Sequence, residues 1–184
     1  MRTQNWIGGF LCLGMIVSAS SALAVIVDVN AVTNCASDDS NAVQLALAAG
    51  SWSVTQIDTT SGGAFTAWSP WSTEAGCDPA GANCSQGWVM SSEIMAPDVP
   101  QFGLGIFDVY ETPALAFAND AESTVITLPT AQTVSFWIED TPCTDNRGGV
   151  SFEVLEAVPT MPSRGLLLLV AVLLIVGSGL LLRR

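Results

Sequence analysis

Between residues 25 and 157, apolar residues alternate with polar ones or form short runs that turn-forming residues separate. A period of two is typical of half-buried strands, and no window keeps the 3.6-residue period of an amphipathic helix. The pattern predicts nine short strands: Val25–Val29, Val43–Ala48, Trp52–Ile57, Ala64–Trp68, Trp88–Ile94, Gly105–Val109, Ser123–Leu128, Thr133–Ile138 and Val150–Leu155. Eight or nine strands at this spacing predict an all-β domain, an antiparallel β-sandwich or jelly roll.

The N-terminal segment Met1–Ala24 has the order of a secretory signal peptide. It begins with Arg2, continues with an apolar stretch over Trp6–Val17, and ends with Ala22 and Ala24 in A-x-A spacing. We therefore predict cleavage after Ala24. A membrane anchor is the alternative, for which the apolar stretch is short.

The C-terminal segment contains an uncharged apolar run, Gly165–Leu182, followed by Arg183 and Arg184. As a helix this run would be about 27 Å long at about 1.5 Å per residue, which suffices to cross a bilayer core. The two arginines favour a cytoplasmic C-terminus and place the preceding body outside. A transmembrane helix is therefore predicted over 165–182.

A short motif precedes this predicted helix, formed by Val158, Pro159, Thr160 and Met161. The tail from Val158 to Arg184 resembles the IPTL-type C-terminal sorting signals of bacteria, which are relatives of the PEP-type signals. These signals consist of a Pro-Thr motif, a hydrophobic helix and a basic cluster. The resemblance implies processing by an exosortase-like membrane protease, after transient insertion in the inner membrane, and release or transfer to the cell surface. A permanent membrane anchor is the alternative.

The charge of the body, residues 25–157, excludes several classes of function. The body holds all 17 carboxylates of the chain against one base, Arg147, and has neither lysine nor histidine. Nucleic-acid binding requires a basic surface, a P-loop requires lysine, and triad or metal chemistry based on histidine requires histidine. With 49% hydrophobic and 12% charged residues, the chain is not of disordered composition. About 130 residues are enough for one core.

Four cysteines lie in the body: Cys35, Cys77, Cys84 and Cys143. An exported protein meets an oxidising environment, in which four cysteines form two disulfides out of three possible pairings. Cys77 and Cys84 bracket a short loop that closes at little entropic cost, so we expect them to pair and leave Cys35 with Cys143. A zinc site is the alternative, although it would lack a C-x-x-C motif and histidine ligands.

The densest run of polar residues, 139–149, lies between two predicted strands. Side-chain oxygens of Asp140, Asp145 and Asn146 are hard ligands of the kind that Ca²⁺ prefers. The backbone carbonyl of Thr144 would add another oxygen. The residues alone leave two interpretations open, a calcium site and a solvated acidic hairpin loop.

This loop resembles the calcium loop of PA-I-type galactophilic bacterial lectins, in which a strand is followed by Asp, Pro, Thr, an acidic or amide residue beside Asn, and Gly. The resemblance implies a jelly-roll sandwich whose calcium directly ligates sugar hydroxyls. It assigns the four residues above as ligands and gives Thr141 a backbone contact to the sugar. The sugar-contacting histidine of those lectins has no counterpart, because Thr73 and Glu74 occupy its neighbourhood.

The body is rich in tryptophan: Trp52, Trp68, Trp71, Trp88 and Trp137. Aromatic faces stack on sugar rings, so Trp68 and Trp71, which flank a Ser-Pro turn, are candidates for a sugar platform. Packing in the core or at its rim is the alternative. Trp137 follows Phe136 on a predicted strand, and the two side chains must therefore point to opposite faces.

These observations predict a non-enzymatic, exported cell-surface protein that binds calcium and an extracellular polysaccharide or other glycan. A glycosidase needs two carboxyl groups that face each other across the substrate. Glu139 and Asp140 are adjacent and point to opposite faces, whereas Asp140 and Asp145 are better suited to sharing a cation. The competing class is a structural surface or biofilm-matrix protein without a specific sugar ligand.

Overall fold

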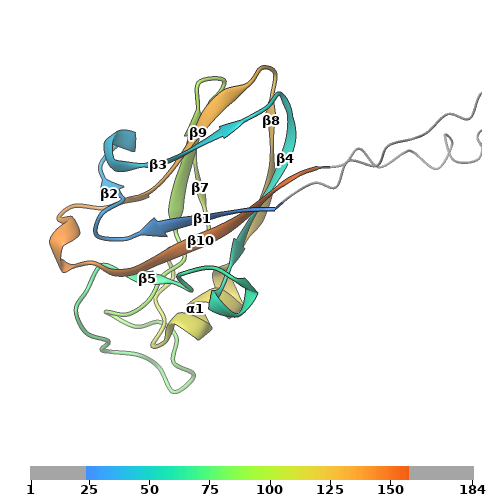
Figure 1. The fold of residues 1–184 in the computed structure, drawn as a ribbon. Helices are drawn as coiled ribbons and strands as arrows, with labels where there is room; N and C mark the ends of the chain where they lie inside the picture. Colours follow the sequence, from blue (N-terminus) through green and yellow to red (C-terminus); the bar gives the residue numbers. More distant parts are fainter. Residues whose placement is uncertain (1–23, 158–184) are drawn as a thin grey trace, which may run out of the picture.

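The computed structural model describes residues 24–157 (Figure 1). The predicted sorting motif, the predicted helix over 165–182 and nearly all of the predicted signal peptide lie outside this range. Within residues 24–157, no helix is long and apolar enough to cross a membrane.

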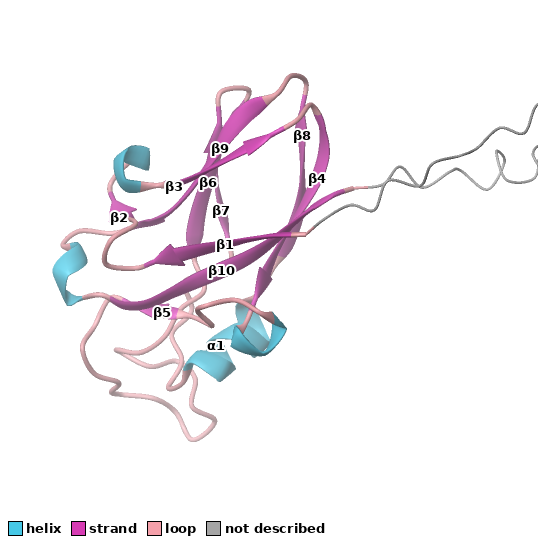
Figure 2. Cartoon of the chain, viewed as in Figure 1, coloured by secondary structure: helices cyan, strands magenta, loops and turns pink. Residues whose placement is uncertain are grey.

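Strands dominate the described chain (Figure 2). They are β1 (Val25–Asn30), β2 (Cys35–Ala36), β3 (Val43–Leu47), β4 (Gly50–Ile57), β5 (Trp68–Ser69), β6 (Ser92–Ala96), β7 (Val99–Leu104), β8 (Ser123–Leu128), β9 (Gln132–Glu139) and β10 (Arg147–Glu156). The helical elements are α1 (Pro113–Asp120) and the short 3₁₀ turns η1 (Asp39–Asn41), η2 (Thr59–Ser61) and η3 (Cys143–Asp145). The all-β prediction is confirmed.

The strands form two sheets that pack as a sandwich. The first has the order β1-β10-β4-β8, with β5 also paired to β10, and the second has the order β2-β9-β6-β7, with β3 also paired to β9. The first and last strands are neighbours, with Val25 opposite Val154. Most pairs are antiparallel, as predicted, but β2 runs parallel to β9.

Apolar side chains from both sheets fill the space between them. On β9, Val134, Phe136 and Ile138 have no exposed surface and belong to this core. The ring of Phe136 lies 5.2 Å, centroid to centroid, from that of Phe152 on β10. Trp137 points to the opposite face of β9 and is nevertheless fully buried. Its indole Nε1 has no hydrogen-bond partner within the described range.

Strands β4 and β5 both pair with β10, at successive positions along its length. Residues 58–67 form a loop between these two strands, which we call the excursion. Ile57 is opposite Ser151, and Trp68 is opposite Gly148. The hydroxyl of Ser151 donates to Asp28 Oδ1 at 2.6 Å and accepts the N–H of Phe65 at 2.9 Å. These bonds tie the excursion to the outside of the sheet.

Two predicted strands are wrong. Ala64–Trp68 lies mostly in the excursion, and its last residue alone enters β5. Gly105–Val109 is a loop, and the strand in this region is β7, which precedes it. The proline at position 100 argues against a central strand, but β7 lies at the edge of its sheet, where a missing N–H is tolerated.

The helix α1 was not predicted, because its eight residues are too few to establish a 3.6-residue period. Its start does carry a local signal. Thr112 is the N-cap, its hydroxyl accepts the N–H of Leu115 at 3.2 Å, and Pro113 occupies the first turn. The predicted strand Trp88–Ile94 also begins late, because β6 starts at Ser92 and Trp88 makes only an isolated bridge to Tyr110.

Candidate ligand-binding end of the sandwich

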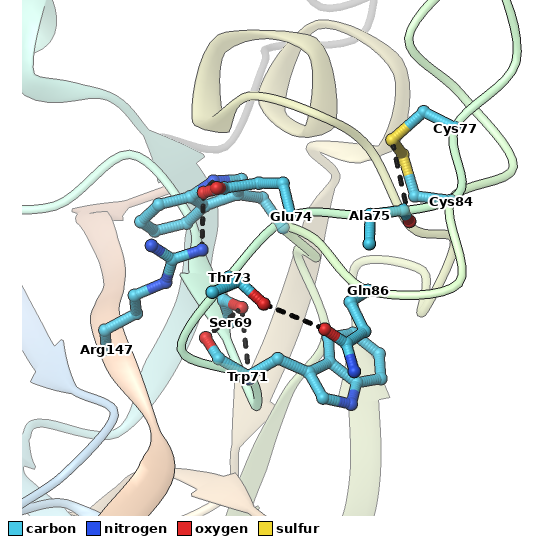
Figure 3. A network of polar contacts seen from close by, with 10 residues as sticks. Ser69, Trp71, Thr73, Glu74, Ala75, Cys77, Cys84, Gln86 and Arg147 are labelled. Atoms are coloured by element: carbon cyan, nitrogen blue, oxygen red, sulfur yellow. Dashed lines mark hydrogen bonds and ion pairs between the residues drawn. A yellow bond between two sulfur atoms is a disulfide. The ribbon is translucent and has the colours of Figure 1, made fainter.

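Two disulfides hold the long loops of the domain, and both are the predicted pairs. Cys35–Cys143 ties β2 to the loop between β9 and β10, and Cys77–Cys84 closes the loop after β5. Figure 3 shows the second bond. All four sulfurs are bonded, so the alternative of a zinc site at these cysteines is wrong.

The acidic loop between β9 and β10 presents several polar side chains to solvent. Thr141, Thr144 and Asp145 are exposed, and Asp140 is half-buried. The turn η3 reverses the chain, and the disulfide at Cys143 fixes the middle of the loop to β2. Asp140 therefore precedes this short turn, and Asp145 is its last residue.

Asn146 lies beneath this loop and is only 6% exposed. Its Nδ2 donates to the backbone oxygen of Ala31 at 2.9 Å, which orients the amide. The Oδ1 atom then has no hydrogen-bond partner within the described range, although it is buried. A buried acceptor without a partner is costly, so this oxygen is suited to a ligand that the protein itself does not supply.

No group of three or more histidine, cysteine or acidic side chains converges in a way that suits a metal within residues 24–157. The predicted calcium ligands include only two carboxylates, Asp140 and Asp145, beside an amide and a backbone carbonyl. The absence of a group of three such side chains therefore does not bear on this set, and the calcium site stays a prediction.

Arg147 follows Asn146 directly and reaches Glu74 at the edge of a polar network (Figure 3). Its guanidinium forms an ion pair with Glu74 and stands 4.4 Å from the centroid of the Trp88 ring. The indole Nε1 of Trp88 donates to the same Glu74 oxygen at 2.9 Å. The pKa of Glu74 is lowered, first by the Trp88 hydrogen bond and then by that from Arg147. The loop containing Glu74 is thereby held beside the acidic loop.

The two tryptophans predicted as a sugar platform have different environments. Trp68 is 1% exposed, and its Nε1 donates to the oxygen of Ser91 at 2.7 Å. Its predicted stacking role is therefore corrected to core packing, because a buried ring offers no face to a ligand. Trp71 is half-buried and lies edge to face with Phe107, whose ring centroid is 6.3 Å away. Phe107 was not among the predicted site residues.

Two buried residues, Tyr110 and Asp120, pack behind the segment that contains Trp88. The hydroxyl of Tyr110 donates to Asp120 Oδ1 at 3.0 Å, and Tyr110 exchanges two backbone hydrogen bonds with Trp88. Burial raises the pKa of Tyr110 to about 12, and the hydrogen bond to Asp120 acts in the same direction. Burial also raises the pKa of Asp120, which therefore keeps its proton to a higher pH than an exposed aspartate does. The pair fastens α1 to the segment below Trp88.

Comparison with protein-family models, curated proteins and solved structures found no match to this chain.

Proposed function

We propose that this is an exported bacterial cell-surface protein whose sandwich domain, of jelly-roll type, binds Ca²⁺ at the acidic loop and a carbohydrate beside it. The proposed ligands are the side chains of Asp140, Asp145 and Asn146 and the backbone oxygen of Thr144. Sugar hydroxyls would complete the coordination of the ion, and Thr141 would add a backbone contact.

The observation that carries the calcium proposal is the buried Oδ1 of Asn146, which has no partner within residues 24–157. Its amide nitrogen is already bonded to Ala31, so the oxygen is oriented before any ion arrives. This amide oxygen and the carboxylates of Asp140 and Asp145 all belong to the loop between β9 and β10, and together they are donors of the kind that Ca²⁺ prefers. The Cys35–Cys143 disulfide limits the motion of the turn.

The position of Glu74 supports the carbohydrate proposal. The sequence resemblance puts Thr73 and Glu74 in the neighbourhood where the related lectins contact the sugar, and Glu74 is paired with Arg147, one residue from Asn146. A polar loop is therefore paired with the first residue of β10, and the proposed sugar would contact this loop as well.

Calcium should raise the melting temperature of the full-length protein, by about 5–10 °C at a hundredfold excess over the dissociation constant. The Asp140→Ala variant should lose this gain, because it removes one of two carboxylate ligands. The measurement is thermal unfolding followed by circular dichroism, with and without calcium.

Glu156→Ala is the matched control for that experiment. It removes one negative charge at the far end of β10 from the acidic loop, so it should keep the full gain. An unchanged melting temperature with calcium would contradict the calcium proposal. A calcium-dependent gain together with a blank glycan array would contradict the carbohydrate half alone.

The proposed export makes its own prediction. Protein recovered from the native host should lack residues 1–24 and the residues that follow about Arg164, because both ends would be removed during sorting. Mass spectrometry of the intact chain tests this. A mature protein that retains Gly165–Arg184 would contradict cleavage and favour a permanent anchor.

A further inference from the structure

A small aromatic and apolar surface lies at the loop end of the sandwich, and the calcium proposal does not use it. It consists of Trp71, Ile106 and Phe107, and we call it the aromatic surface. Ile106 is 47% exposed and Phe107 is 51% exposed, whereas most large apolar side chains of the domain are buried. Two adjacent apolar residues this exposed on one loop suggest a binding role.

The aromatic surface is held in place before any ligand arrives. Phe107 lies edge to face with Trp68 as well as with Trp71, at centroid distances of 6.1 and 6.3 Å. The hydroxyl of Ser69 donates to the oxygen of Trp71 at 2.9 Å and accepts its N–H at 3.2 Å. In Figure 3 the ring of Trp71 extends away from Arg147. A pre-organised ring loses little conformational entropy on binding.

The surroundings of the aromatic surface are acidic. Asp108 is exposed and follows Phe107 in the chain. The carboxylate of Glu122 accepts the N–H of Gly105 at 3.0 Å, next to Ile106. Within residues 24–157 the only base is Arg147, and it is paired with Glu74. A ligand at this surface therefore meets aromatic faces and negative charge, both of which attract cations.

We propose that the aromatic surface binds the ammonium-bearing sugar units of an amino-polysaccharide, a polymer of de-N-acetylated hexosamine. The apolar face of a sugar ring packs on Phe107 and Trp71, and the ammonium group lies against an aromatic face beside Asp108. This inference depends on the proposed carbohydrate-binding function and names the ligand class. It does not use the calcium ion.

The size of the surface favours a sugar over a protein partner. A stable protein interface buries about 800 Å² on each partner and involves about 20–30 residues. Three side chains are far fewer, but they match the area of one or two sugar rings. The charge favours an amino sugar over an acidic or sulfated one, because anionic chains would be repelled.

The test is a calorimetric titration of the full-length protein with glucosamine hexamer, at low salt and with a calcium chelator present. We expect saturable binding that weakens as salt is added, because the ammonium groups are screened. Phe107→Ala and Phe107→Leu should both bind roughly tenfold more weakly, since both remove the ring. Val125→Ala is the matched control, because Val125 is 60% exposed on β8, and it should bind normally.

A second pair of variants separates local from overall charge. Asp108→Asn and Asp98→Asn change the net charge equally, but Asp98 lies between β6 and β7, one strand length from Gly105. We expect only Asp108→Asn to weaken binding, by roughly fivefold. An equal effect of the two variants would overturn the inference and indicate nonspecific attraction to an acidic protein.

Two further ligands complete the test. N-acetylglucosamine hexamer should bind at least about tenfold more weakly, because acetylation removes the ammonium charge. Hexalysine should compete with glucosamine hexamer only at concentrations at least about tenfold higher, because it has the ammonium groups but no sugar ring to pack on Phe107. Equal binding of the acetylated hexamer, or equally strong competition by hexalysine, would overturn the inference. If glucosamine hexamer fails while a glycan array shows calcium-dependent binding, this inference fails and the proposed function stands.

Discussion

Removal of the Cys35–Cys143 disulfide should lower the free energy of unfolding of the full-length protein by about 4–5 kcal/mol. The two cysteines are 108 residues apart in sequence, so the bond constrains almost the whole domain in the unfolded state. Stabilisation of this origin grows with the length of the closed loop and is about 4.7 kcal/mol for 100 residues. The measurement is urea unfolding of the Cys35→Ser, Cys143→Ser double variant beside the oxidised parent.

The Cys77–Cys84 disulfide provides the matched control, since its cysteines are only 7 residues apart. The Cys77→Ser, Cys84→Ser double variant removes the same chemical groups but should cost only about 2 kcal/mol, because the closed loop is short. Equal losses from the two double variants would show that loop length does not govern the effect. The first variant also releases position 143 of the acidic loop from its covalent link to β2, so it should weaken any calcium binding as well.

Gln56→Leu should lower the free energy of unfolding by about 3–4 kcal/mol, because Gln56 joins the two sheets through the core. Its side chain is 3% exposed on β4. The Nε2 atom donates to the backbone oxygen of Leu104 on β7 of the other sheet at 3.2 Å, and to that of Met90 in the segment before β6 at 2.7 Å. The Oε1 atom accepts the N–H of Glu122 at 2.9 Å. Leucine fills the volume but leaves the Met90 oxygen and the Glu122 N–H without these partners, at a cost of about 1–3 kcal/mol each. The Leu104 oxygen keeps the hydrogen bond from the Ser92 hydroxyl.

The same substitution at an exposed strand position tests whether the loss comes from the buried hydrogen bonds or from the change of glutamine to leucine itself. Gln44 lies on β3 and is exposed. Gln44→Leu should change the free energy of unfolding by less than about 0.5 kcal/mol in the same urea experiment. A loss below about 1 kcal/mol in Gln56→Leu would show that water or a rearranged neighbour replaces the lost hydrogen bonds.

Alternation of apolar and polar residues was sufficient to predict most of the strands. The predicted Ser123–Leu128 coincides with β8, and Val43–Ala48, Thr133–Ile138 and Val150–Leu155 each overlap a strand almost fully. These strands have one or both faces buried, so the positions of their apolar residues follow from which face meets the core. The failures at Ala64–Trp68 and in the segment after β7 lie outside the regular pairing of the sheets, where burial comes from loops folding over the core.

The candidate site was only partly predictable for a similar reason. The acidic loop is contiguous in sequence, so its composition alone indicated a cation site. Glu74 and Arg147 are far apart in the chain, and only the fold brings them together on the ring of Trp88. The sequence pattern did not identify Phe107 as a site residue, because a single phenylalanine in a loop is distinguished only by its neighbours in space.

The amino-acid sequence by itself determined the all-β class, the pairing of the four cysteines and the acidity of the body, because these depend on local periodicity, on loop length and on composition. The tertiary structure alone decided which tryptophan is buried and which is accessible, and which oxygen of Asn146 is left without a partner. It also decided that Arg147, the only base of the described domain, is paired with Glu74. These properties depend on which distant segments pack together, and local sequence patterns do not encode that.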